Sequence, residues 1–148
     1  MPDVFVVNRE AYRITNETEN TMRNFLTSYL NSHSNSDQHI LIDQCKKYDK
    51  DTMETEDAYT RAVDWRTRNA KRGLAVSMNP LIAYCSIRDL ATLTQSIAKD
   101  NSLLYQVGES LDEISDIRDA VMHNQFIEFE ALQKLKDLQA EIWSVIAE

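Results

Sequence analysis

Six apolar residues recur at intervals of three and four in the stretch from residue 104 to residue 121. They are Leu104, Val107, Leu111, Ile114, Ile117 and Val121. On an α-helix this spacing places all six on one face, which is the arrangement that packs against a protein core. The stretch therefore predicts a long amphipathic helix that ends close to residue 123, with helices as the main building block of the chain.

Residues that form tight turns are scarce in this sequence. Its 148 residues include only two glycines and two prolines, and β-branched residues are scattered rather than grouped. An all-β fold needs many such turns, whereas a few helices joined by polar loops do not. The length suits one domain with a modest core. We therefore expect a single all-α domain over residues 1–148, built as a bundle of about five to six helices.

Apolar periodicity and breaking residues divide the chain into expected helices. Asn16 and Glu19 have the spacing of a capping box, so a first helix is expected from there to Leu30. Further helices are expected at 38–47, at 55–72 with Gly73 at its end, from Pro80 to a break at 100–102, at 104–123 and at 125–147. Residues 1–14 are read as an N-terminal arm or a helix lead-in, and residues 49–57 as a loop.

Several classes of protein are excluded by what the sequence lacks. No run approaches the roughly 18 apolar residues of a membrane span, and the N-terminus has no secretory signal pattern. Cys45 and Cys85 stand far apart among apolar neighbours, so we expect both to be reduced and buried. His33 and His39 have no partners at metal-ligand spacing, and no nucleotide fingerprint is present. These observations predict a cytoplasmic protein with no metal, no cofactor and no membrane partner.

A short basic segment contrasts with the net charge of −8. Its five basic residues are Arg61, Arg66, Arg68, Lys71 and Arg72. One interpretation is a solvated helix face, and the other is a patch that contacts RNA phosphates. The acidity of the whole chain argues against a general coat of nucleic acid, so any RNA contact is expected to be local.

The residues best suited to catalysis and phosphate binding lie at the end of the helix expected at 104–123. They are Arg118, Asp119 and His123. Arg118 borders the apolar stripe, where an arginine that is simply exposed to solvent is less expected. Asp119 precedes His123 by four residues, so its carboxylate can reach the imidazole on a helix. The pattern of an arginine and a histidine is common by chance, and only this context makes it a candidate site.

Arg118 and His123 cannot both face one phosphate on a regular helix. Five residues correspond to about 140° of rotation and about 7.5 Å of rise, so the two side chains diverge. Either the helix loosens near His123, or a second copy of the chain completes the site across a two-fold interface. We expect the second arrangement, a homodimer.

The same residues carry a resemblance to a known family. The segment Leu111-x-x-Ile114-x-x-Ile117-Arg118-Asp119-Ala120-Val121-Met122-His123 resembles the signature helix of the HEPN superfamily. Residues 87–93 are similar to the helix that precedes this signature in many microbial members, and residues 19–30 are loosely similar to the first helix. The resemblance covers most of 80–148 and, loosely, 15–32. Asp119 stands where the family often has Asn, and Asn124 stands where Pro frequently follows the His.

The resemblance implies a dimeric helical bundle whose active members are metal-independent endoribonucleases. In that chemistry the 2′-hydroxyl of RNA attacks the neighbouring phosphate and leaves a cyclic phosphate. His123 would be the general acid–base group, Arg118 would bind the scissile phosphate, and Asp119 would orient Arg118 or His123. Members of the family commonly act as toxins or in defence against phage.

Two other readings stay open from the sequence. One is a non-catalytic HEPN module that binds RNA or protein, or dimerises, within a defence or toxin–antitoxin system, with a neutralising partner protein. The strong acidity of the chain suits a protein partner better than RNA. The other is an unrelated helical bundle in which the motif is accidental.

Overall fold

The computed structural model describes residues 3–32, 46–49, 54–73, 81–98, 101–123 and 125–147. In chain order, the elements are α1 (Val4–Ser32), β1 (Lys46–Asp49), β2 (Glu54–Asp57), α3 (Ala58–Lys71), the 3-10 turn η1 (Leu81–Tyr84), α4 (Ile87–Ala98), α5 (Ser102–Met122) and α6 (Phe129–Ile146). Within these ranges the architecture is a helical bundle with one small hairpin beside it. The expected helical class is confirmed.

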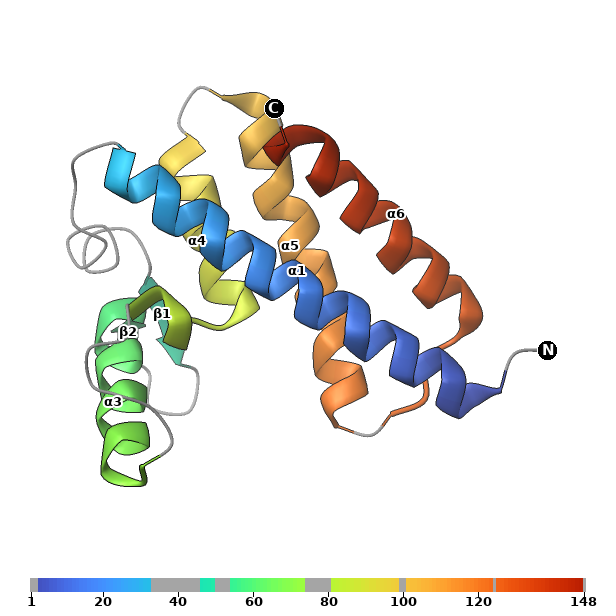
Figure 1. The fold of residues 1–148 in the computed structure, drawn as a ribbon, viewed down its shortest axis with the longest axis horizontal. Coiled ribbons are helices and arrows are strands. Elements are labelled where there is room, and N and C mark those ends of the chain that lie inside the picture. Colours follow the sequence, from blue (N-terminus) through green and yellow to red (C-terminus); the bar gives the residue numbers. More distant parts are fainter. Residues whose placement is uncertain are drawn as a thin grey trace.

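Helices α1, α4, α5 and α6 form the bundle, and α3 lies beside it with the hairpin and η1 (Figure 1). Helix α5 runs antiparallel to both α4 and α6, and α1 packs across all three. Each of the four helices contributes fully buried side chains to one core, such as Leu26, Leu93, Leu111 and Leu135. The apolar stripe of α5 lies at the centre of this packing, which agrees with its spacing in the sequence.

Helix α1 begins much earlier than the sequence analysis placed it. An oxygen of the Asp3 carboxylate accepts a hydrogen bond from the backbone N–H of Phe5, at 2.8 Å, and this helps the helix to begin at Val4. Val7 belongs to the buried core, so this first segment packs in the bundle and is not an extended arm. Asn16 lies inside the helix and is exposed, so the capping box expected there is wrong.

The hairpin of β1 and β2 is a second difference. Its strands are antiparallel, with Lys46 opposite Asp57 and Tyr48 opposite Thr55. Strand β1 replaces the end of the helix expected at 38–47, and the two strands replace part of the loop expected at 49–57. Residues 38–45 of the expected helix lie outside the described residues. The helix at 38–47 is expected only from Leu41, Ile42 and Cys45, and so short a pattern does not separate helix from strand.

Local signals explain where the other helices begin and end. Ser86 and Asp89 cap α4 reciprocally, since each backbone N–H donates to the other side chain at 3.2 Å. This capping box separates η1 from α4, where the sequence analysis expected one continuous helix. The Asn101 side chain accepts from the N–H of Leu104 at the start of α5, as the predicted break implies. Gly73 has a φ of 69° just after α3, as expected for a glycine that ends a helix.

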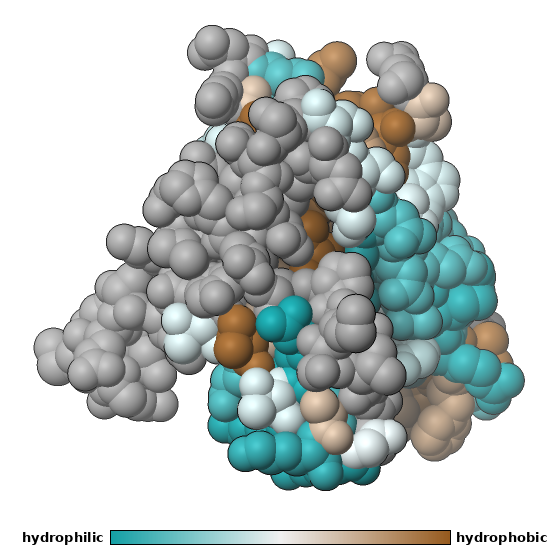
Figure 2. Space-filling model, turned by 60° about the vertical axis from the view of Figure 1, so that its left-hand side comes forward, coloured by the Kyte–Doolittle hydropathy of each residue, from teal (hydrophilic) through white to brown (hydrophobic). Residues whose placement is uncertain are grey.

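The remaining expectations on the fold concern single residues and the surface. Cys85 is a buried, reduced thiol as expected, whereas Cys45, His33 and His39 lie outside the described residues. None of the described helices is long and apolar enough to cross a membrane. Figure 2 shows a face on which the coloured surface is mostly hydrophilic and the hydrophobic residues form small separate spots.

Candidate functional site

The end of α5 keeps regular helical geometry up to the candidate histidine. The helix extends to Met122, and the backbone N–H of His123 donates to the carbonyl oxygen of Asp119 at 3.0 Å. A loosened helix that would turn Arg118 and His123 toward each other is therefore not observed. On this continuous helix the two side chains leave in directions about 140° apart.

The imidazole of His123 is held by the main chain rather than by a carboxylate. Its Nδ1 atom lies 2.7 Å from the carbonyl oxygen of Asp119. A carbonyl oxygen can only accept, so Nδ1 donates this hydrogen bond and carries the proton in the neutral ring. The Nε2 atom is then the nitrogen that can take up or release a proton. The contact expected between the Asp119 carboxylate and the imidazole is replaced by one with the Asp119 main chain.

Arg118 is anchored at the border of the core, with 34% of its side chain exposed. Its Nε lies 3.3 Å from Oε1 of Glu19, and its Nη1 lies 3.5 Å from Oδ1 of Asp119. The expected role of Asp119 in orienting Arg118 fits the second contact. The first contact ties α5 to α1 and limits the directions in which the guanidinium can point.

Glu19 lies near the candidate site, and its ion pairs were not predicted from the sequence. Only 10% of its side chain is exposed, and it lies between Arg118 and Arg23, whose Nη2 is 3.3 Å from Oε2. Oε1 of Glu19 is buried and makes no hydrogen bond among the described residues, so its charge is balanced by ion contacts alone. Its spacing of four from Arg23, beside the buried Met22, is the sequence signal for such a pair.

Arg88 of α4 faces a row of carboxylates on α5. Its Nη2 lies 2.7 Å from Oδ1 of Asp116 and 3.8 Å from Oδ2 of Asp119, and its Nε lies 3.8 Å from Oδ1 of Asp112. The three aspartates follow one another at intervals of four and three, which places them on one helix face. Asp119 therefore lies between two arginines, one on its own helix and one on α4.

The basic segment lies on and just after α3, away from the end of α5 (Figure 1). Arg61 forms an ion pair with Asp89 of α4 in which both side chains are largely buried. Arg68 pairs with Asp64 at 2.7 Å, and its guanidinium lies 5.7 Å from the ring centre of Trp65. Part of the expected RNA-binding patch is thus engaged within the chain.

The other basic residues of this segment differ in exposure. Lys71 and Arg72 are exposed, and Arg66 is half-buried. One protomer does not bring any of these residues next to His123, because α3 packs against η1 and β2 instead. The basic segment and the motif therefore do not lie on one surface within a single chain.

Large exposed apolar side chains occur near His123 in the sequence and at the start of α1. We call Phe5, Phe126 and Phe129 the aromatic cluster; they are 64%, 58% and 44% exposed, and Met122, next to His123, is 48% exposed. The rings of Phe5 and Phe126 stack edge to face, with centroids 5.2 Å apart and planes at 85°. Exposed aromatic residues of this kind are enriched at protein interfaces.

The comparisons with known proteins add no relative. No protein-family model, no curated protein and no solved structure matches this chain. Within the described residues, no group of three or more His, Cys, Asp or Glu side chains is placed to hold a metal ion. The function is therefore inferred from the side-chain geometry at the end of α5.

Proposed function

We propose that this chain is a HEPN-type, metal-independent endoribonuclease that cleaves RNA at a composite site completed by a second copy. The anchored imidazole of His123 is the observation that carries the proposal. Because Nδ1 donates to the carbonyl oxygen of Asp119, Nε2 can accept a proton from a substrate hydroxyl. An exposed helix end also leaves room for an RNA strand beside this nitrogen.

The reaction needs one proton acceptor, one proton donor and a cation at the phosphate. Nε2 of His123 takes the proton of the 2′-hydroxyl while the 2′-oxygen forms a bond to the adjacent phosphorus. The bond from phosphorus to the 5′-oxygen breaks, and an imidazolium group gives that oxygen a proton. The products are a 2′,3′-cyclic phosphate and a 5′-hydroxyl. Arg118 stabilises the negative charge that develops on the phosphate oxygens.

The composite arrangement is supported by two features of the end of α5. Arg118 and His123 diverge on a continuous helix, so a phosphate bound by Arg118 of one copy would meet His123 of another. The aromatic cluster includes residues close to His123 in the sequence and offers apolar surface that a second copy can bury. A role in a toxin–antitoxin system or in phage defence belongs to this proposal through the family resemblance.

The test combines metal-free cleavage with complementation between variants. Purified protein is incubated with labelled RNA in EDTA, as wild type, as Arg118→Ala, as His123→Ala and as a mixture of the two variants refolded together. We expect wild type to give cyclic-phosphate ends and each variant to lose at least about 100-fold in rate. Mixed dimers combine one intact Arg118 with one intact His123, so about a quarter of the wild-type rate should return.

A matched control shows whether the loss of any arginine charge lowers the rate. Arg13→Ala removes an exposed arginine of α1 and should cleave like wild type. No metal-free cleavage by the wild type, or cleavage that survives both Arg118→Ala and His123→Ala, would contradict the proposal. A protein that stays monomeric, or a mixture without recovered activity, would contradict the composite site in particular.

A non-catalytic binding or dimerisation module is the second candidate. The observation in its favour is the ion-pair network that already engages Arg118 with Glu19, and Asp119 with Arg88. In such a module these residues hold α1, α4 and α5 together, and RNA or a neutralising partner protein binds elsewhere. A stable dimer without ribonuclease activity, which Glu19→Gln destabilises, would support this candidate.

A further inference from the structure

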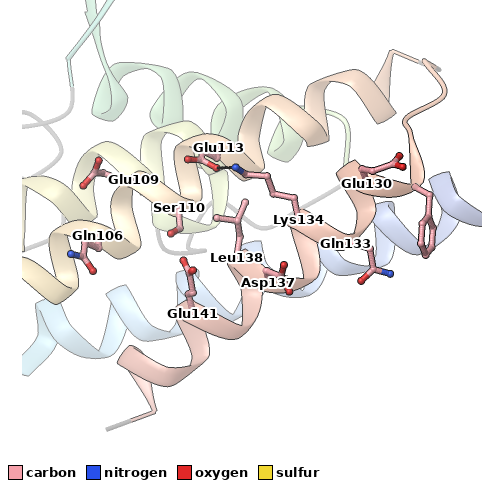
Figure 3. A pocket seen from close by; sticks show the side chains of 11 residues that line it. Gln106, Glu109, Ser110, Glu113, Glu130, Gln133, Lys134, Asp137, Leu138 and Glu141 are labelled. Atoms are coloured by element: carbon pink, nitrogen blue, oxygen red, sulfur yellow. Dashed lines mark ion pairs between the residues drawn. The ribbon is translucent and has the colours of Figure 1, made fainter.

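An open groove with a volume of about 810 Å³ lies between α5 and α6 (Figure 3). Carboxylates dominate its lining, with Glu109 and Glu113 from α5 and Glu130, Asp137 and Glu141 from α6. Among the described residues that line it, the single cation is Lys134, whose Nζ lies 3.3 Å from Oε2 of Glu113 on the other side of the groove. The groove is therefore strongly negative along its length.

A hydroxyl at the floor of this acidic groove adds a feature that is independent of charge. Ser110 is only 9% exposed, lines the groove and points toward α6 in Figure 3. Among the described residues its hydroxyl has no hydrogen-bond partner. Its Oγ is not one of the fully buried side-chain atoms that lack a partner, so it reaches the open groove and can hydrogen-bond to a ligand there.

We propose that this groove binds a segment of a partner protein that is rich in lysine and arginine. Glu130 and Glu141 are eleven residues apart on α6, so the carboxylates extend over about 16 Å. A basic segment presents ammonium or guanidinium groups along such a length, and a donor among them can reach Ser110. The negative groove repels the phosphates of RNA, so a basic peptide is the occupant that its charge fits.

Lys134 occupies the position that a cation of the partner would take. Its contact with Glu113 bridges the groove, and both side chains are more than half exposed, so the pair is weakly held. A basic segment would replace this lysine at Glu113, and removal of Lys134 should favour binding. The proposal concerns a surface separate from Arg118 and His123, and it does not depend on the ribonuclease activity.

The first experiment measures binding of a defined probe by calorimetry at low and physiological salt. The probe is a twelve-residue peptide of alternating lysine and alanine, compared with spermine and with a peptide in which glutamate replaces lysine. Three groove acids are neutralised together in the variant Glu109→Gln, Asp137→Asn, Glu141→Gln. The matched control removes three charges on α1 and α3 through Glu10→Gln, Glu17→Gln and Asp64→Asn.

We expect the groove variant to bind the basic peptide about tenfold more weakly, and the control to stay within about twofold of wild type. No binding of the peptide to wild type at low salt would overturn the proposal. Equal weakening in the groove variant and the control would overturn it too, because that result indicates only a response to net charge. Spermine bound as tightly as the peptide would identify a small polyamine site instead.

A second pair of variants tests the groove even if the triple variant folds poorly. Lys134→Gln removes the cation inside the groove, and Lys136→Gln removes the same charge two residues later, outside the groove. We expect Lys134→Gln to strengthen peptide binding several-fold and Lys136→Gln to change it by less than about twofold. Equal effects of the two substitutions would contradict a binding mode in which the peptide replaces Lys134.

Discussion

Nδ1 of His123 lies 2.7 Å from the main-chain oxygen of Asp119, while the carboxylate of the same aspartate lies near Arg118 and Arg88. Asp119 thus contacts His123 through its main chain and the two arginines through its side chain. Its carbonyl oxygen fixes the imidazole, and its carboxylate joins the ion-pair network between α4 and α5. The orientation of His123 therefore does not depend on the charge of a carboxylate, and this relationship can be tested directly.

The neutral imidazole of His123 should carry its proton on Nδ1, because the carbonyl oxygen of Asp119 can only accept. Nitrogen chemical shifts from long-range ¹H–¹⁵N correlation spectra report the tautomer of each histidine. The substitution Asp119→Asn keeps the main-chain oxygen, so the Nδ1–H tautomer should persist in that variant. A dominant Nε2–H tautomer in wild type, or a change of tautomer in Asp119→Asn, would contradict this account of the site.

Glu19 should matter for stability far more than its neighbour Glu17. Glu19 is buried between two arginines, so Glu19→Gln leaves their charges poorly compensated and should cost about 2 kcal/mol in the free energy of unfolding. Among the described residues the half-exposed Glu17 pairs only with the exposed Arg13, so Glu17→Gln should cost less than about 0.5 kcal/mol. Urea unfolding followed by circular dichroism compares the two, and equal costs would argue against a structural role for Glu19.

Gly108 should be required where α5 crosses α4. A Cβ atom at this position would overlap Cγ of Gln95 and lie 3.0 Å from the carbonyl oxygen of Ala91. Because backbone cannot yield as a side-chain tip can, Gly108→Ala should destabilise the protein by about 1–3 kcal/mol despite the better helix propensity of alanine.

The second described glycine provides the comparison for this substitution. Gly73 has open space around the Cβ position but a φ of +69°, so Gly73→Ala should cost only about 1 kcal/mol through backbone strain. Thermal unfolding of both variants checks the difference. A Gly108→Ala protein as stable as wild type would show that α4 and α5 can separate at little cost.

Asn8 should hold the connection between α5 and α6. Its Nδ2 donates to the carbonyl oxygen of Gln125 at 2.7 Å, and its Oδ1 accepts from the N–H of Ile127 at 3.1 Å. Asn8→Asp keeps the acceptor and loses the donor, whereas Asn8→Ala loses both. Amide hydrogen exchange at Ile127 should therefore be fastest in Asn8→Ala and intermediate in Asn8→Asp. Unchanged exchange in Asn8→Ala would contradict the proposed restraint.

A pH-dependent contribution to stability should come from Glu10. The hydrogen bond from Arg13 lowers the pKa of the Glu10 carboxyl below its ordinary value. A lowered pKa in the folded state stabilises the protein above the ordinary pKa of glutamate, and this contribution is lost as the pH falls through the lowered value. Carbon NMR titration should show the Glu10 midpoint rising in Arg13→Gln. A midpoint that does not move would exclude Arg13 as the cause.

The sequence predicted the parts of the fold in which one pattern runs over many residues. The α5 stripe contains six apolar residues, and Asn101 and Gly73 have strong local preferences for helix ends, so these features were found. The start of α1 was missed because the four apolar residues from Val4 to Val7 suit an arm as well as a helix. The Asp3 side chain, one residue before Val4, helps to decide between them.

The partners at the candidate site were harder to predict, because they come from distant parts of the chain. Glu19 meets Arg118 across two helices, and Arg88 meets Asp119 across another pair. The spacing of residues in one sequence does not predict which charged side chains of different helices meet when the helices pack. The row of aspartates on α5 is the sequence signal for a cation opposite it.

The two hydrogen bonds of Asn8 also fix the length of the connection after His123. They hold Gln125 and Ile127, two residues apart, on a single amide group. One inserted residue between these positions would force the amide to release one bond, and a deletion would do the same. This short connection therefore tolerates changes of residue better than changes of length, and linkers or tags for engineering belong at other surface positions.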